Sequence, residues 1–216
     1  LTKLVVDHAG VPQAAWQLVR RSNLEAVEGV LNALEARFSY PMFVKPAGTG
    51  SSVGVSKAAN REALEQALLN AGKYDEKILV EEFIHGREIE VAVMGNEEPV
   101  ASICGEIDSG ADFYDYDAKY VTDTSTAYIP ARIPADVQEQ IRKEAVKVYK
   151  AIGCRGLSRV DFFATYAENR VVFNEINTLP GFTSISMYPK LFGASGIPYR
   201  QLIDLLLQLA QEAYDG

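Results

Sequence analysis

Two short runs, Ser158-Arg159-Val160-Asp161 and Asn174-Glu175-Ile176-Asn177, decide how the C-terminal half of this sequence folds. Apolar residues flank both runs and a polar segment around Glu168 separates them, which predicts two antiparallel strands joined by a turn. If the turn centres on Glu168, Asp161 lies opposite Glu175 and Arg159 opposite Asn177. Successive side chains of a strand point to opposite faces, so these four polar groups share one face. The same alternation places on the other face Val160, Phe162, Val172 and Ile176.

The polar face of this hairpin predicts a cation site. Two carboxylates that oppose each other across a strand pair repel unless a cation lies between them. A divalent ion with oxygen ligands would remove that repulsion. Mg²⁺ held by one or two carboxylates usually completes its coordination with substrate phosphates.

Composition limits the possible functions. The chain has 216 residues, 48% of them hydrophobic and 23% charged, which suits one large globular domain or two small ones. A net charge of −8 argues against nucleic acid as the main partner. No apolar run approaches the roughly 20 residues of a membrane span and no signal-like segment opens the chain, so we expect no membrane partner and a cytoplasmic location. Cys104 and Cys154 give no disulfide framework and suit buried thiols.

The periodicity predicts an α+β fold. Four helical stripes are expected, near residues 27–38, 64–71, 137–152 and 202–213, the first behind a cap at Ser22-Asn23, the second behind Asn60 and the third ending at Gly153. Expected strands span 42–45, 53–57, 77–83, 87–94 and 100–108, with a tight turn at Gly95-Asn96. Short connections indicate largely antiparallel sheets. Residues 109–126 form a long polar loop, which is typical of a functional or a disordered segment.

Other segments suggest anion binding. The glycine-rich and hydroxyl-rich segment 46–54 can turn backbone N–H groups toward an anion, although a plain hairpin turn fits as well, and it is not a Walker A loop. Lys45 precedes it at a strand end. Glu81 and Glu88 flank a strand connection and could accept hydrogen bonds from ribose hydroxyls, or be ordinary surface charges. His8 and His85 belong to no recognisable nucleophile arrangement, which argues against Ser or Cys catalysis.

Taken in order, six motifs resemble the ATP-grasp enzymes, specifically the D-alanine–D-alanine ligase family. They are Phe43-Val44-Lys45-Pro46, Gly50-Ser51-Ser52-Val53-Gly54, Glu81-Glu82-Phe83, the segment Tyr114–Tyr120, Ser158–Asp161 and Asn174–Thr183. The resemblance covers essentially the whole chain. It implies two α+β subdomains that enclose a nucleotide: a central lid subdomain at residues 1–85 and a C-terminal catalytic subdomain at 86–216. The chain starts at Leu1 without Met, so we expect the family's N-terminal substrate domain to lie upstream.

The resemblance also implies roles for individual residues. Lys45 and Lys119 would hold ATP phosphates under a loop containing Ser51 and Ser52, and Arg159 and the Gly181 N–H would stabilise an oxyanion. The implied site residues are Arg159, Gly181, Ser51 and Tyr120 for catalysis, Lys45, Ser52, Glu81, Phe83, Glu88, Phe113 and Lys119 for the nucleotide, Ser186 and Met187 for the second amino acid, and Asp161, Glu175 and Asn177 for the metal.

The implied reaction is the ATP-dependent joining of two D-alanine molecules through an acyl phosphate, for peptidoglycan and hence for cell wall and cell shape. The cofactors would be ATP and two Mg²⁺ ions, or Mn²⁺ in their place, and the full-length protein would be a homodimer. Two alternatives remain: a related ligase that accepts D-serine or D-lactate, and a nucleotide-binding fragment without activity of its own. The Lys119-Tyr120 pair and Met187 favour D-alanine, whereas many relatives carry histidine where Ile185 stands.

Overall fold

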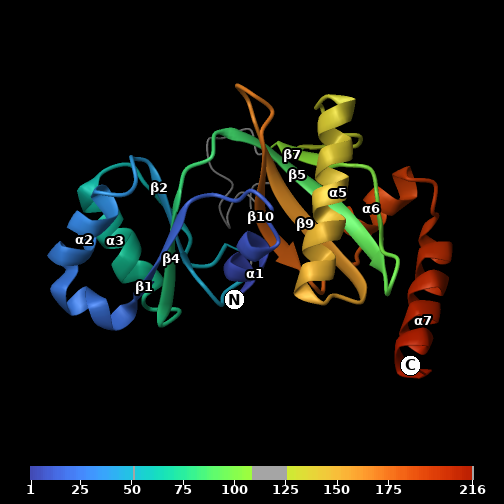
Figure 1. Ribbon diagram of the computed structural model, residues 1–216, viewed down its shortest axis with the longest axis horizontal. Helices are drawn as coiled ribbons and strands as arrows, with labels where there is room; N and C mark the ends of the chain where they lie inside the picture. The colour runs from blue at the N-terminus through green and yellow to red at the C-terminus, as the bar shows by residue number, and fades with distance from the viewer. Residues whose placement is uncertain (51, 109–125, 216) are drawn as a thin grey trace. The chain divides into compact units, whose positions relative to one another are not determined.

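The computed structural model describes residues 1–50, 52–108 and 126–215, and these form two compact units (Figure 1). The small unit is Ala14–Ile84. The large unit comprises Leu1–Gln13, His85–Asp108 and the chain from Thr126 onward. Both units combine helices with an antiparallel sheet, which confirms the α+β class. The functional division at residues 85 and 86 stays a prediction, and residues 1–13 pack with the large unit, where the Phe173 N–H donates to the Pro12 carbonyl at 2.7 Å.

The small unit is a four-stranded antiparallel sheet with helices on one face. Its strands follow the order β1-β4-β2-β3. Their bounds are β1 Trp16–Arg20, β2 Met42–Pro46, β3 Ser56–Ala58 and β4 Lys77–Glu82. The helices are a 3-10 helix at Arg21–Ala26, α2 at Val27–Glu35 and α3 at Arg61–Ala71. Apolar side chains of α2 and α3 pack on Met42, Val44 and Val80 to form the core on one face of the sheet.

The large unit has a six-stranded antiparallel sheet of order β10-β9-β5-β7-β8, with β6 paired to β5. Its strands are β5 Gly86–Gly95, β6 Val100–Ala101, β7 Gly105–Asp108, β8 Thr126–Tyr128, β9 Gly156–Thr165 and β10 Val171–Asn177. Its helices are α1 Thr2–His8, α5 Ala135–Ile152, α6 Met187–Ala194 and α7 Tyr199–Asp215. Helices α1 and α5 cover one face of the sheet, and α6 and α7 pack against part of the other (Figure 1).

Local sequence signals explain the start of α3 and the end of α5. The Asn60 side chain accepts a hydrogen bond from the Ala63 N–H at 2.9 Å and caps α3, as predicted. Gly153 ends α5 in the left-handed region at φ 75°, also as predicted. The expected cap at Ser22-Asn23 is wrong, because α2 begins only at Val27 and the Asn23 side chain instead accepts from the Arg20 N–H. Helix α6 was not predicted.

The hairpin of β9 and β10 confirms the predicted pairing: Glu175 lies opposite Asp161 and Asn177 opposite Arg159. A β-bulge between Phe173 and Glu175 inserts one extra residue. This extra residue shifts the alternation, so Val172 pairs with Phe163 on the polar face and Phe173, not Val172, lies on the core face. The placement of Val172 with Val160, Phe162 and Ile176 is therefore wrong.

Two expected strands and one expected turn also differ from prediction. The strand expected at residues 53–57 begins only at Ser56, and that expected at 100–108 is split into β6 and β7. The β5–β6 connection is longer than a two-residue Gly95-Asn96 turn, since Met94 pairs with Val100.

Among the helices of the described residues, none combines the length and apolar character that a membrane crossing requires.

Candidate active site

Polar side chains gather on one face of the large unit's sheet, in rows that cross neighbouring strands. Strand register places Glu175, Asp161 and Glu90 side by side on β10, β9 and β5, with Gly105 of β7 next in the row. The adjacent row contains Asn177, Arg159 and Ala92. Helix α6 covers the face beyond these rows, because a Cβ at Gly105 would lie 2.5 Å from the Met187 Cε. The polar rows thus end where the apolar contact with α6 begins.

Among the described residues, Arg159 brings a positive charge to this face, and its main partner is Asp161. Its Nε donates to Asp161 Oδ1 at 2.8 Å and its Nη2 to Asp161 Oδ2 at 2.7 Å, a two-pronged pairing that is stronger and more directional than a single contact. Its Nε also lies 3.4 Å from Glu90 Oε2. Burial alone lowers the pKa of Arg159, but attraction and hydrogen bonding from Asp161, with the charges of Glu90 and Glu175, raise it above its ordinary value. Arg159 therefore stays charged.

Asn177 links the two opposed carboxylates. Its Nδ2 donates to Asp161 Oδ2 at 3.3 Å and to Glu175 Oε1 at 3.4 Å. Two carboxylates and an amide oxygen are ligands that suit Mg²⁺ chemically. Within the described residues, no group of three or more His, Cys, Asp or Glu side chains is arranged to hold a metal ion. Of the residues that the structure describes, Arg159 offsets the repulsion with its positive charge, so Asp161 would have to exchange a guanidinium for a metal.

The small unit carries a second polar row, on the sheet face away from its helices. Register aligns Trp16, Glu81, Phe43 and Lys57 across its four strands. Lys45 Nζ lies 2.6 Å from Glu81 Oε2, and Glu81 is only 5% exposed. This burial is unusual for a glutamate and argues against the reading of Glu81 as an ordinary surface charge.

An aromatic group lies beside this ion pair. The Phe83 and Phe43 rings stack with centroids 5.9 Å apart, and Lys57 Nζ lies 4.4 Å from the Phe83 ring centroid. Aromatic rings beside an ammonium are groups that pack favourably with a flat aromatic ligand. Lys57 was not singled out from the sequence, because its place beside Phe83 depends on the pairing of β2 with β3.

The glycine-rich segment 46–54 is partly held by the protein itself. The Gly48 N–H donates to Asp75 Oδ2 at 2.7 Å, and Thr49 Oγ1 donates to the Val53 carbonyl at 3.1 Å. The hydrogen bond from the Lys77 N–H, together with that from Gly48, lowers the pKa of Asp75 despite its opposing burial. Ser52 has a φ of 59°, in the left-handed region. An anion in this loop would compete with Asp75 for the Gly48 N–H.

The residues expected to bind the second amino acid lie around the start of α6. The Thr183 N–H donates to Ser186 Oγ at 3.0 Å, and a Cβ at Gly181 would lie 2.9 Å from that same oxygen, so Gly181 and Ser186 are neighbours. Met187 is 8% exposed and packs in the core under α6, which leaves little of its side chain for a ligand. Glu88 lies on β5 opposite Phe163, one row from Glu90. The predicted site residues Ser51, Phe113, Lys119 and Tyr120 lie outside the described residues.

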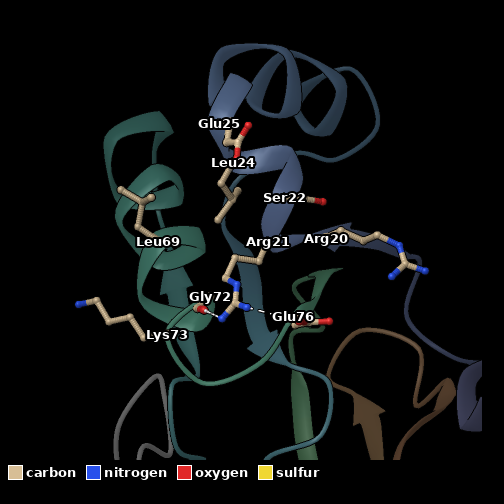
Figure 2. A pocket seen from close by; sticks show the side chains of 9 residues that line it. All are labelled: Arg20, Arg21, Ser22, Leu24, Glu25, Leu69, Gly72, Lys73 and Glu76. Carbon is tan, nitrogen blue, oxygen red and sulfur yellow. Dashed lines mark hydrogen bonds and ion pairs between the residues drawn. The ribbon is translucent and has the colours of Figure 1, made fainter.

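A separate hollow of about 670 Å³ opens in the small unit, between the 3-10 helix and the end of α3 (Figure 2). Its lining includes Arg20, Arg21, Lys73, Glu25 and Glu76. Figure 2 shows Arg21 reaching across it to the Gly72 carbonyl and to Glu76, at 3.5 and 3.4 Å. None of the predicted site residues that the structure describes lines it.

Comparison with known proteins identifies the family. The family model for the D-ala D-ala ligase C-terminus matches residues 5–208. The chain is 53% identical over 214 residues to a D-alanine–D-alanine ligase of Acetivibrio thermocellus, covering 99% of this chain and 57% of that protein. It is 54% identical over 213 residues to one of Chlorobium limicola, covering 98% of this chain and 59% of the relative. The chain thus spans a little under three fifths of the length of these relatives.

Solved structures agree. The VanG D-Ala:D-Ser ligase of Enterococcus faecalis superposes with a TM-score of 0.86 at 39% identity, over 96% of this chain and 60% of that one. The D-alanine–D-alanine ligase of Coxiella burnetii superposes with a TM-score of 0.85 at 37% identity, over 99% and 56%. These similarities confirm the ATP-grasp fold expected from the motifs. The chain belongs to the D-Ala–D-Ala ligase family, whose C-terminal region it carries.

Proposed function

We propose that this chain forms the nucleotide-binding and catalytic part of an ATP-dependent ligase that joins two D-alanine molecules for peptidoglycan precursors. The observation that carries the proposal is the polar face of the large unit, where Arg159 lies 2.7 Å from Asp161 and the register sets Glu175 and Asn177 beside them. Family membership and about 50% identity to D-alanine–D-alanine ligases support it. The enzyme class that fits is a carboxylate–amine ligase.

The large unit would perform the chemistry. In the proposed reaction a D-alanine carboxylate attacks the γ-phosphate of ATP and displaces ADP to give an acyl phosphate. The amine of a second D-alanine then attacks the acyl carbon, and inorganic phosphate and a proton leave as the peptide bond forms. Asp161, Glu175 and Asn177 would hold Mg²⁺, which when bound neutralises charge on phosphate oxygens. Arg159 and the Gly181 N–H would stabilise the carbonyl oxyanion of the second step, since donors fixed before the reaction lower its barrier most. No covalent enzyme intermediate is needed.

The small unit would bind the nucleotide. Lys45 would contact phosphate oxygens, and its ammonium pairs with Glu81 on the sheet face away from the helices. Phe83, stacked on Phe43, would form one wall for adenine. We assign Glu88 to the ribose by family resemblance. We assign Ser51, Ser52, Lys119 and Tyr120 to the phosphate and acceptor sites and Phe113 to the adenine site by family resemblance alone.

Parts of the substrate site would come from outside this chain. The relatives are longer, and we propose that a preceding domain supplies much of the first D-alanine site. We further propose a homodimer and a cytoplasmic location, where ATP and D-alanine are available. The ligase turnover and the nucleotide binding of this chain by itself are measured separately. Nucleotide binding without turnover would indicate a binding module that needs the other domain for catalysis.

D-serine is the second candidate acceptor, because one similar structure is a D-Ala:D-Ser ligase. Phosphate release should be measured with D-alanine, D-serine and D-lactate in turn, using the protein as its full gene encodes it. We expect D-alanine to give the highest kcat/KM as acceptor. A higher value for D-serine or D-lactate would overturn the assignment of the acceptor but not that of the ligase.

The metal assignment is tested by Glu175→Gln. This change keeps the size of the side chain but removes a charged ligand, so ligase turnover should be abolished while the fold persists. Glu168→Gln, an exposed position in the turn of the same hairpin, is the matched control and should leave turnover unchanged. Full turnover in Glu175→Gln would refute the metal role.

A further inference from the structure

Glu90 occupies a position on the polar face that the proposed reaction does not use. It lies on β5, the strand between β9 and β7, and register places it directly beside Asp161. Its side chain is 14% exposed and its Oε2 is 3.4 Å from Arg159 Nε. Strand β5 has ten residues and is hydrogen-bonded on both sides, so it fixes the Glu90 backbone firmly.

Asp161 faces two demands that conflict. In this structure both of its oxygens accept hydrogen bonds from Arg159, at 2.8 and 2.7 Å. If Asp161 binds a metal, as the proposed function requires, at least one of these bonds is lost. Arg159 is half-buried and charged, and a charge in such a place is costly without an opposing carboxylate. Its position would then no longer be fixed by Asp161.

We infer that Glu90 is a positioning residue that holds the Arg159 guanidinium in place when Asp161 turns to the metal. This inference rests on the proposed function and deepens it. The guanidinium has N–H groups on several sides, so it can bind Glu90 through Nε while the Nη groups face a reacting oxygen. In this role Glu90 acts through Arg159 and not on the substrate or the metal. Partners of this kind typically change activity by about 10- to 100-fold when removed.

The first experiment needs neither metal nor turnover. Asp161→Asn removes the charge of the main partner, and Asp161→Asn/Glu90→Gln removes both. Hydrogen exchange of the Arg159 Nε–H is followed by NMR, with the resonance assigned by its absence in Arg159→Lys. We expect the protected resonance to persist in Asp161→Asn and to be lost in the double variant. Equal protection in both would overturn the inference. Backbone amide spectra show whether each variant is folded. If the double variant does not fold, Glu90→Gln alone replaces it. In Glu90→Gln the Arg159 Nε–H should exchange faster than in the parent, and unchanged exchange would overturn the inference.

The second experiment measures activity in the protein as its full gene encodes it. Glu90→Gln should lower kcat by about 10- to 100-fold with little change in the KM for ATP, and Glu90→Asp should restore part of the loss. The matched control is Glu106→Gln, because Glu106 is also a buried strand carboxylate paired with an arginine, Arg132, but lies opposite the core residue Ile89. Glu106→Gln should lower stability and leave kcat unchanged.

The outcomes separate the two proposals. An unchanged kcat in Glu90→Gln, or an equal loss in Glu106→Gln, would overturn the positioning role. If the parent protein releases no phosphate with D-alanine, the proposed function fails, and the exchange measurement on Arg159 still decides the role of Glu90.

Discussion

The pair formed by Lys45 and Glu81 gives the sharpest test of how the small unit is built. Lys45 Nζ lies 2.6 Å from Glu81 Oε2, and the two side chains are 21% and 7% exposed. Lys45→Met keeps the length of the side chain and removes its charge, so Glu81 stays in a largely buried place without the opposing ammonium. Removing one partner of a buried pair costs about 3–5 kcal/mol, and the partial exposure of Lys45 favours the lower end, about 3 kcal/mol.

Glu81→Gln in the Lys45→Met background should recover most of that loss. An uncharged pair of similar volume avoids the desolvation penalty, so the double variant should be about 2 kcal/mol more stable than Lys45→Met. The exposed Lys73→Met, at the end of α3 in the same unit, is the control and should change stability by about 0.5 kcal/mol or less.

Urea unfolding followed by tryptophan fluorescence reports on this unit alone. Trp16 is the single tryptophan of the sequence and lies on β1 directly opposite Glu81. The difference between the variants is read from the unfolding midpoints. Stability losses that simply add in the double variant, or a Lys45→Met protein as stable as the parent, would refute the reasoning. Nucleotide binding should be weakened in Lys45→Met whichever way stability changes, because the proposed phosphate contact is gone.

Two further predictions concern the large unit. Gly86→Ala should destabilise it by about 1–3 kcal/mol, because the new Cβ would lie 2.5 Å from the Ala164 carbonyl oxygen. Gly193→Ala in α6 has open space around the new Cβ and should be neutral or stabilising. Thermal unfolding of both variants would check this, and equal effects on stability would contradict it. Burial raises the pKa of the Cys104 thiol from 9.0 to about 12, so the contribution of this thiol to stability is complete below pH 9 and is lost as the pH rises toward 12. In Cys104→Ala the decline in stability over this pH range should therefore be smaller than in the parent. An identical pH profile of stability in the two proteins would contradict the buried-thiol assignment.

The features predicted correctly are those set by nearby residues. The β9–β10 pairing follows from the position of one turn, and the ends of α3 and α5 follow from Asn60 and Gly153. Val172 was assigned to the wrong face because the bulge before Glu175 has no sequence signal of its own. Strict alternation from Val171 to Asn177 treats the extra residue of the bulge as an ordinary strand position, which reverses the faces of the residues before it. Residues 1–13 could not be assigned to the large unit either, since their contact with Phe173 joins segments far apart in the chain.

The acidic residues show why the rest of the site was not predictable. In the sequence Glu81, Glu88 and Glu90 are similar glutamates within two expected strands, 77–83 and 87–94, and exposure at the surface is the simplest reading of each. The sheets separate them: Glu81 pairs with Lys45, Glu88 lies beside Phe163, and Glu90 lies beside Asp161 within reach of Arg159. Glu88 and Glu90 differ by one row of the same strand, and that row depends on the register of β5 against β9, some 70 residues away. Side-chain patterns fix which face of a strand a residue occupies, but only the register between distant strands fixes its lateral neighbour. Chemistry that depends on lateral neighbours, as the holding of Arg159 by Glu90 does, therefore becomes visible only in the folded sheet.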